Sequence, residues 1–303
     1  MTASPDDTRP ASNAPRAAAT ILLLREAGAR VEVLMVRRHA NLAFMAGMWV
    51  FPGGSLHASD TSPQALAMLD VASIAKQLQL RDLQGQALPA SLIAGLAFAA
   101  CRETFEETGV LLARHADGSA CDTAVIARMQ EHRDAVNADA SLFVPLLQKE
   151  GLRPDTSTLR YWAHWITPSS APRRFDTRFF AVRAPESHLA SADASETVES
   201  CWMTPGDLVA AAQRREMPIS HPTQCNLHDL HVALQRHGSL TALLDAEAAR
   251  TVHPIVPKMF READHSVIVM PWDATYEASP GDGPSLSASE CGALAELPSR
   301  VIV

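Results

Sequence analysis

Continuous apolar runs near the start of the chain predict strands. The segment 19–26, ATILLLRE, and the segment 30–38, RVEVLMVRR, are rich in residues that favour strands, and Gly28 between them signals a turn. We expect these two strands to pair in a core sheet. The segment 48–56, MWVFPGGSL, continues as a short strand that Pro52 interrupts. The two glycines that follow favour close approach of the backbone to a neighbour or a ligand.

A helical period replaces the strand pattern after this glycine pair. Residues 63–85 predict one helix, and Pro89 ends its pattern. Ser91 is placed to cap a second helix, which we expect to end at Gly109. One side of this second helix is apolar and is expected to face the core, while the other side carries acids. The apolar positions are Ala94, Phe98, Cys101, Phe105 and Leu112.

The second half of the chain mixes strand-like and helix-like segments without a strict βαβ order. This mixture favours an α/β fold in which a mixed sheet packs between helices. From residue 277 onward, Gly, Pro, Ser and Ala dominate, and we expect a mobile tail. The predicted strands are 160–168, 175–184, a short one through Trp202, and 265–273, and the predicted helices are 123–150, one capped near Thr204, and 224–250.

Composition narrows the class of protein. The 303 residues are 47% hydrophobic, which is enough for a substantial core. A net charge of −8 argues against nucleic-acid binding, which needs a basic surface. The five cysteines show no C-x-x-C spacing, and no apolar stretch approaches the ~18 residues of a membrane span. We expect a cytoplasmic protein without a membrane or nucleic-acid partner, with a disordered leader over residues 1–17.

Three glutamates crowd the segment 102–110, RETFEETGV. At about 100° per residue, Glu103, Glu106 and Glu107 fall within an arc of roughly 100° on a helix. Like charges at this spacing repel one another. One interpretation is a solvated helix face. The other is a site for a hard divalent cation, whose charge turns the repulsion into binding energy.

This segment resembles the second half of the Nudix box. The pattern is G, five residues, E, seven residues, then R-E-U-x-E-E-x-G-U, where U is bulky and apolar. Residues 102–110 match it in register, except that Thr104 stands at an apolar position whose role passes to Phe105. Gly54 and Asp60 match the first half, with Asp60 in place of the usual Glu. The 41 residues from 61 to 101 stand where the usual box has seven.

An interruption at this point is found in the long Nudix branch that includes coenzyme A diphosphatases of peroxisomes. The chain is similar to that branch from about Ala18 to Tyr276. The resemblance implies a Nudix-type mixed β-sheet sandwiched between helices. Further matching features are WVFPGG, ITPSSAPRRFDTRFF, HPTQCNLHDL, and the spacing of Glu196, Trp202 and Pro205. The implied parts are a Nudix hydrolase domain over 18–215 with a helical insertion at 61–95, a C-terminal helical extension over 216–276, and the tail over 277–303.

The resemblance also implies a metal-dependent site. Nudix enzymes hydrolyse a nucleoside diphosphate linked to another moiety, with Mg²⁺ or Mn²⁺. The implied metal ligands are Glu103, Glu106 and Glu107, with backbone carbonyl groups from the region of Gly54. Arg102 is implied to be structural, paired with Asp60 or with a box glutamate. The alternative for Asp60 is a helix cap.

Other candidate residues each have a plain alternative. Glu196 is an additional catalytic acid or a loop acid. The four arginines are substrate-binding residues that act with Gly53 and Gly54, or else ordinary charges at a sheet edge or in solvent: Arg37, Arg38, Arg173 and Arg174. Trp162 and Trp165 are assigned to the core. The insertion leaves and rejoins the chain beside the glycine loop, so we expect it to border the substrate entrance.

The predicted function is therefore a metal-dependent diphosphatase with a small nucleotide substrate. The leading substrate is coenzyme A or an acyl-CoA, and the alternatives are ADP-ribose and NADH. A different class, a Nudix-fold nucleotide-binding regulator without catalysis, would be expected to lose acids of the box, whereas all three are present here. A homodimer is compatible with the sequence.

Overall fold

The computed structural model describes residues 14–41, 45–185 and 197–302. Residues 1–13 of the predicted leader and the candidate acid Glu196 lie outside these ranges. The last residues assigned to the leader, Arg16 and Ala17, already belong to the first strand.

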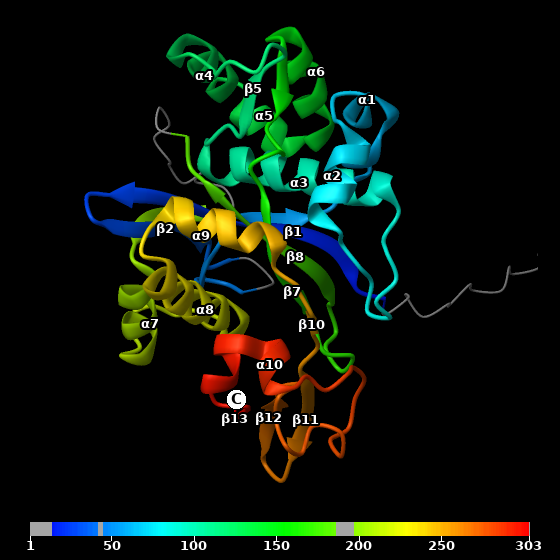
Figure 1. The fold of residues 1–303 in the computed structure, drawn as a ribbon, viewed down its shortest axis with the longest axis vertical. Coiled ribbons are helices and arrows are strands. Elements are labelled where there is room, and N and C mark those ends of the chain that lie inside the picture. Colours follow the sequence, from blue (N-terminus) through cyan, green and yellow to red (C-terminus); the bar gives the residue numbers. More distant parts are fainter. Residues whose placement is uncertain (1–13, 42–44, 186–196, 303) are drawn as a thin grey trace, which may run out of the picture.

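A mixed eight-stranded sheet forms the centre of the protein (Figure 1). The predicted hairpin is confirmed, because its first two strands pair antiparallel and Gly28 takes a φ of 63° in the turn. The first strand also pairs in parallel with β8, which makes the sheet mixed. The sheet order is β10 (Pro254–Ile255), β7 (Arg160–Ile166), β8 (Phe175–Arg183), β1 (Arg16–Ala27), β2 (Arg30–Arg38) and β3 (Trp49–Val50), with β4 (Gly53–Ser55) paired to β1 and β9 (Thr197–Met203) paired to β2.

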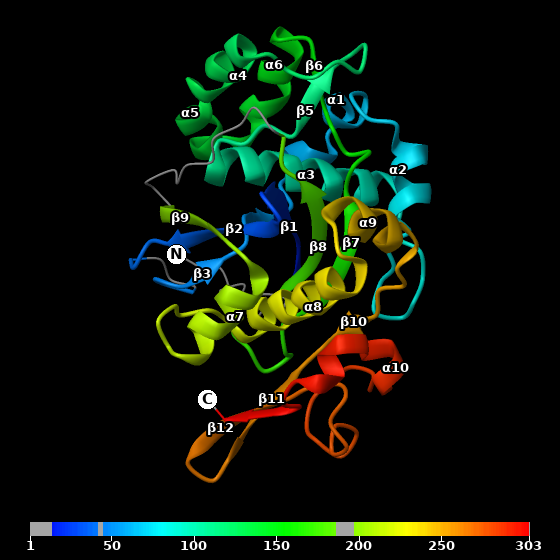
Figure 2. The ribbon, with the colours of Figure 1, turned by 60° about the vertical axis from the view of Figure 1, so that its left-hand side comes forward.

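Alternation along β1 divides its apolar residues between two cores. Leu22 and Leu24 face the core that is covered by α7 (Pro205–Gln213), α8 (His221–His237) and α9 (Leu240–Ala246). Ile21 and Leu23 face the opposite core, which is covered by α2 (Val71–Leu78) and α3 (Ala90–Thr108). Figures 1 and 2 show α3 on one side of the sheet and α8 on the other. The predicted sheet between helices is confirmed.

Helix α3 is buried on more sides than its sequence pattern predicts. A third layer covers the side of α3 away from the sheet, and Phe105 stacks there on Phe143, with ring centroids 5.6 Å apart. Gly109 ends the helix as predicted, with a φ of 71°. Ser91 does not cap it, because the helix begins at Ala90 with Pro89 at the N-cap position, so Ser91 lies inside the first turn. The third layer consists of α4 (Thr123–Gln130), α5 (Arg133–Ala138), α6 (Phe143–Lys149), β5 (Ala113–His115) and β6 (Leu152–Pro154).

Several long predicted helices are broken into shorter ones. Residues 63–85 form only α1 (Pro63–Leu66) and α2, after the 3-10 turn η1 (Ala58–Thr61), and α2 ends where Gln79 takes a left-handed φ of 47°. The predicted helix over 123–150 is divided by the turn η2 (Ala140–Leu142). The predicted helix over 224–250 is interrupted at Gly238, and the turn η3 (Glu247–Ala249) follows α9. Apolar periodicity continues across these breaks, so it does not reveal them.

The insertion at 61–95 packs on α3. Its apolar residues Ile74, Leu78 and Leu80 join the core beneath that helix. Its two ends also touch, since a Cβ atom built on Gly95 would lie 2.4 Å from Thr61 Cγ2.

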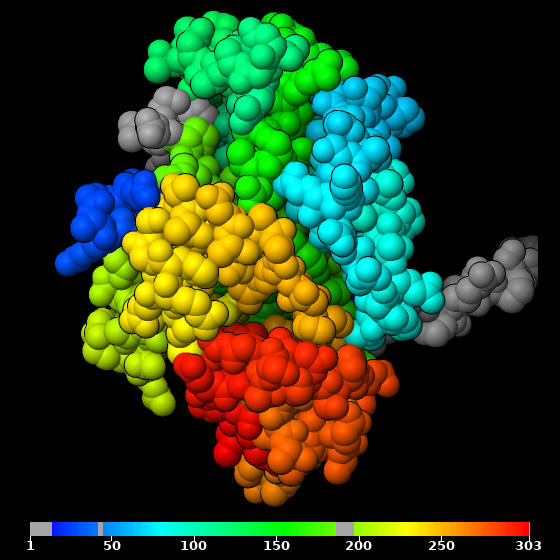
Figure 3. Space-filling view, in the orientation of Figure 1, coloured from blue at the N-terminus to red at the C-terminus, as the bar shows by residue number. Residues whose placement is uncertain are grey.

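The C-terminal segment is ordered, so the prediction of a mobile tail from 277 is wrong. Leu286, Cys291 and Leu294 are buried in the same core as α8. Figure 3 shows this red segment as a lobe packed below the yellow helices. The composition signal missed these widely spaced apolar residues. The elements of the lobe are β11 (Lys258–Glu262), β12 (His265–Val269), β13 (Arg300–Ile302), α10 (Ala288–Cys291) and the turn η4 (Gly292–Glu296). Among the described residues, no helix has the length and apolar character needed to cross a membrane.

Candidate active site

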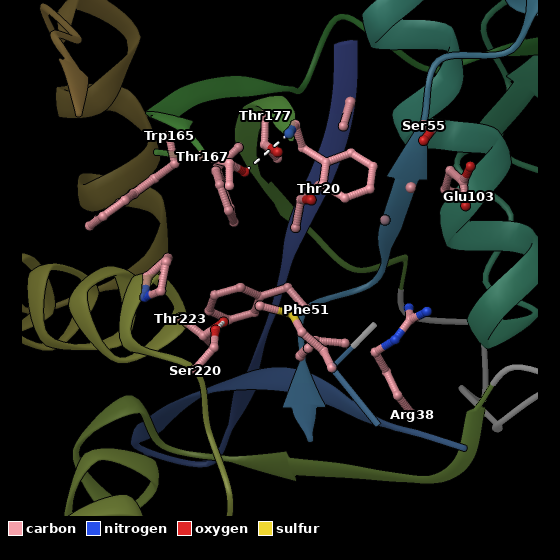
Figure 4. A pocket seen from close by; sticks show the side chains of 18 of the residues that line it. Thr20, Arg38, Phe51, Ser55, Glu103, Trp165, Thr167, Thr177, Ser220 and Thr223 are labelled. Atoms are coloured by element: carbon pink, nitrogen blue, oxygen red, sulfur yellow. Dashed lines mark hydrogen bonds between the residues drawn. The ribbon is translucent and has the colours of Figure 1, made fainter. Parts of the chain in front are cut away.

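A pocket of about 560 Å³ lies between the sheet, α3 and the start of α8 (Figure 4). It brings together residues that are distant in the sequence. The predicted site residues that line it are Arg38, Gly53, Gly54, Glu103, Glu106, Glu107 and Arg173.

The glycine pair holds the acidic helix close to the sheet. A Cβ atom on Gly54 would lie 2.6 Å from the carboxylate of Glu103, so a side chain at this position would displace that carboxylate. The backbone N–H of Gly53 donates to Glu107 Oε2 at 3.0 Å. A Cβ atom on Gly53 would lie 2.5 Å from the carbonyl oxygen of Ala19 on β1. Both glycines therefore permit close approach of β4 to its neighbours.

Arg102 is buried and binds several carboxylates at once. Its Nε and Nη2 donate to the two oxygens of Asp60 at 2.8 and 2.9 Å. Its Nη1 donates to Glu103 Oε1 at 3.0 Å and to Glu106 Oε2 at 2.9 Å. Asp60 also accepts a hydrogen bond from the backbone N–H of His57 within a capping box. Asp60 is therefore both the partner of Arg102 and part of a helix cap. The turn η1 places this acid, which is shorter than the usual Glu, within reach of the arginine.

Three acids compete for this single guanidinium. Burial opposes the charge of Arg102, but its hydrogen bond to Asp60 and the charges of Glu103 and Glu106 outweigh burial and raise its pKa. Burial raises the pKa of Glu106 to about 7, against the opposing effect of Arg102. In the described part of the chain, Glu106 Oε1 is buried and has no hydrogen-bond partner. The cluster therefore has an excess of negative charge and a spare oxygen donor.

The donors fit a hard divalent cation, which binds carboxylate and carbonyl oxygens. Among residues 14–41, 45–185 and 197–302, no group of three or more His, Cys, Asp or Glu side chains is already arranged to hold a metal ion. The contacts explain this, because Glu103 and Glu106 each turn one oxygen toward Arg102 and Glu107 accepts from Gly53. The spare oxygen of Glu106 and the carboxylate against Gly54 are the donors that a cation would use.

The arginine candidates separate into two groups. Arg38 lines the pocket, and its Nη1 lies 3.9 Å from Glu107 Oε1. Its neighbour Arg37 does not line the pocket and instead donates to Glu199 Oε2 at 3.2 Å. Arg173 lines the pocket, whereas Arg174 does not and donates to the Thr167 carbonyl at 3.1 Å. The structure thus brings one arginine of each pair to the site.

Some site residues were missed by the sequence interpretation. The buried Arg133 on α5 donates from Nε to the backbone carbonyl of Glu106 at 2.8 Å, and Asn137 on the same helix lines the pocket. Neither residue belongs to a motif in the sequence. Trp165, assigned to the core, is buried but also lines the pocket.

The expected place of the insertion is wrong. None of residues 61–95, all of which the structure describes, lines this pocket. Part of the insertion, from Gln77 to Gly85, instead borders a second cavity of about 650 Å³ together with residues 247–254. Packing on α3 holds the insertion away from the entrance.

Comparison with known proteins places this architecture in a family. A family model for the NUDT19 Nudix domain matches residues 11–230. The acyl-coenzyme A diphosphatase NUDT19 of Gallus gallus is 28% identical over 291 residues, covering 82% of this chain and 74% of the relative. The protein of the same name from Homo sapiens is 27% identical over 273 residues, covering 80% and 72%.

A solved structure supports the same assignment. The NUDIX hydrolase from Alicyclobacillus acidocaldarius aligns with a TM-score of 0.57 and 28% identity, over 80% of this chain and 99% of that one. The resemblance inferred from the interrupted box and the expected fold are confirmed. Because the family model spans well over half of its length, the chain belongs to the NUDT19 Nudix family.

Proposed function

We propose that this Nudix diphosphatase hydrolyses coenzyme A or an acyl-CoA, giving 3′,5′-ADP and 4′-phosphopantetheine or its acylated form. One observation carries the proposal. The pocket joins the carboxylate cluster of α3 to a neutral region that runs away from it across the sheet. The two relatives named acyl-coenzyme A diphosphatases support the choice of substrate.

We further propose that Glu103, Glu106 and Glu107 hold Mg²⁺ or Mn²⁺, with a backbone carbonyl group at Gly54. A bound divalent ion supplies charge neutralisation for the diphosphate and a lower pKa for the attacking water. Arg102 keeps two of these carboxylates in place, and the Gly53 N–H holds the third. Glu196 stays a predicted additional acid.

The two pocket arginines are the proposed phosphate-binding groups. Arg38 lies beside Glu107, so it suits the diphosphate. Arg173 comes from the segment before β8 and reaches the pocket from another side. A charge-assisted contact from either one to the 3′-phosphate of coenzyme A would be worth about 1.5–3 kcal/mol, or roughly 10- to 150-fold in selectivity over dephospho-coenzyme A.

The test is kcat/KM for coenzyme A, dephospho-coenzyme A, ADP-ribose and NADH, with Mg²⁺ and with Mn²⁺. We expect coenzyme A to be the best of the four, and Glu107→Gln to lower its hydrolysis by orders of magnitude in a folded protein. A clear preference for ADP-ribose or NADH would reject coenzyme A and retain the hydrolase. Binding without turnover of any of the four would favour the regulator.

The location and the assembly of the protein remain predictions from the sequence. A cytoplasmic location is proposed from the composition, and fractionation of the source cells tests it. A homodimer is compatible with the chain, and light scattering of the purified protein tests that assembly.

A further inference from the structure

Four neighbouring strands place a row of residues along the floor of the pocket. Trp165 on β7 is the Cα partner of Thr177 on β8. Thr177 is paired with Ala18 on β1, and Thr20, two residues further along β1, is paired with Gly53 on β4. All five residues line the pocket. In the view of Figure 4, Thr20 and Thr177 lie between Glu103 and Trp165.

The middle of this row offers neutral hydrogen-bonding groups. The side chains of Thr20 and Thr177 are half-buried, and within the described residues neither hydroxyl makes a hydrogen bond to the protein. Phe51 and Phe179, two other lining residues, pack edge to face with ring centroids 6.4 Å apart. The row thus combines free hydroxyl groups with apolar surface and carries no charge between Gly53 and Trp165.

We infer that this row binds the pantetheine arm of the substrate, with the phosphate end at Gly53 and the thiol end at Trp165. The inference rests on the proposed function and adds the direction in which the substrate lies. The arm carries two amides and one hydroxyl, which need hydrogen-bond partners when they leave water. It also carries two methyl groups and methylene segments, which gain from apolar contact. The arm carries no charge, which matches a row that has no charged side chain to pair with one.

The lengths agree. Crossing from β4 to β7 takes three strand spacings of about 4.8 Å, or roughly 14 Å. The arm has about twelve bonds from the phosphate oxygen to the sulfur, equivalent to four extended residues and roughly 14 Å. The second ribose of ADP-ribose spans only about half of that length. It reaches the strand of Thr20, one strand short of Thr177.

Thr177→Val tests the row, because valine keeps the shape of threonine and removes its hydroxyl. We expect the ratio of kcat/KM for coenzyme A to kcat/KM for ADP-ribose to fall about three- to tenfold, the effect of one lost neutral hydrogen bond. Thr123→Val, at the exposed start of α4, is the matched control and leaves the ratio unchanged.

Binding of free pantetheine to the metal-free full-length protein, measured by calorimetry, is independent of hydrolysis. We expect Thr177→Val to weaken this binding by a similar factor. If coenzyme A is cleaved but Thr177→Val changes neither the ratio nor pantetheine binding, the row is not the arm site and only this inference fails. If the wild type binds pantetheine through Thr177 but does not cleave coenzyme A, the row stands and the proposed reaction fails.

Discussion

Gly53 and Gly54 are adjacent, but they are glycines for different reasons. An added Cβ at Gly53 would meet backbone atoms of Ala19 and Thr20 on β1. The same atom at Gly54 would meet only the end of the Glu103 side chain, which can rotate away. One glycine therefore serves the sheet, and the other keeps a carboxylate in position.

Gly53→Ala and Gly54→Ala are expected to separate stability from activity. Gly53→Ala forces β1 and β4 apart and lowers the free energy of unfolding by about 1–3 kcal/mol, as for other overpacked sites. Gly54→Ala displaces Glu103 at little cost to stability and lowers kcat/KM by at least tenfold. Urea denaturation and initial rates on both variants check this. Equal losses of stability in the two proteins would contradict it.

Glu106 gives the metal-free protein a pH dependence. Its pKa of about 7 in the folded chain lies above the ordinary 4.5, so folding favours the protonated carboxyl. The stabilisation is fully present below the unfolded pKa and is lost as the pH rises through the folded one. Without metal, the free energy of unfolding should therefore fall between about pH 5 and pH 8.

The variant Glu106→Gln isolates this effect, because it cannot titrate. The difference in free energy of unfolding between Glu106→Gln and wild type, measured in chelator at several pH values, should increase in favour of the variant toward alkaline pH. A difference that stays constant with pH would exclude titration of this carboxyl in that range.

Among the helices, α3 depends on its neighbour α5 for its last turn. A helix leaves its final carbonyls without partners inside the helix. Arg133 donates to the Glu106 carbonyl, and Thr197 donates from Oγ1 to the Glu107 carbonyl at 3.3 Å. The cation at this end also interacts favourably with the helix dipole. The two carbonyls that Arg133 and Thr197 satisfy belong to the same turn as the candidate metal ligands.

Arg133→Gln should destabilise the protein by about 2 kcal/mol, because a buried cation and its hydrogen bond are lost at a helix C-terminus. The Arg133→Gln substitution should also weaken Mn²⁺ binding, measured by calorimetry or by the electron paramagnetic resonance signal of Mn²⁺. The control Arg128→Gln removes the half-exposed arginine that pairs with Glu150, and should be near neutral because exposed ion pairs contribute little to stability. Unchanged Mn²⁺ affinity in Arg133→Gln would limit Arg133 to a role in folding.

Local signals explain which elements could be predicted from the sequence. Gly109 ends α3 and Thr204 caps α7, because a left-handed residue and a capping hydroxyl act within one turn. Contacts between distant segments leave no such pattern, so the link from α5 to α3 was missed. On the strand β2, successive side chains point to opposite faces, and the sequence does not tell whether Arg37 or Arg38 faces the pocket.

At the scale of the whole molecule, the C-terminal lobe contributes side chains to the main hydrophobic core. Truncation of the lobe tests this contribution. Deleting residues 284–303 removes the buried Leu286, Cys291 and Leu294 and the strand β13. We expect a loss of at least about 4 kcal/mol, since each buried apolar side chain contributes about 1.5–3 kcal/mol. Thermal unfolding of the truncated chain measures it. Ile302→Ala, at a side chain that is 68% exposed, is the control and should be near neutral. An unchanged Tm after truncation would instead support the prediction that this segment is a mobile tail.

The contact between Thr61 and Gly95 has a consequence for how this protein can vary. The two ends of the insertion are already in contact, so it behaves as a closed loop. Doubling the length of such a loop costs only about 0.6 kcal/mol of closure entropy. Asp60 and Arg102 lie outside the insertion, so they remain paired whatever the length of the insertion. Relatives can therefore gain or lose residues between these points and keep the carboxylates of α3 in register with the glycine loop.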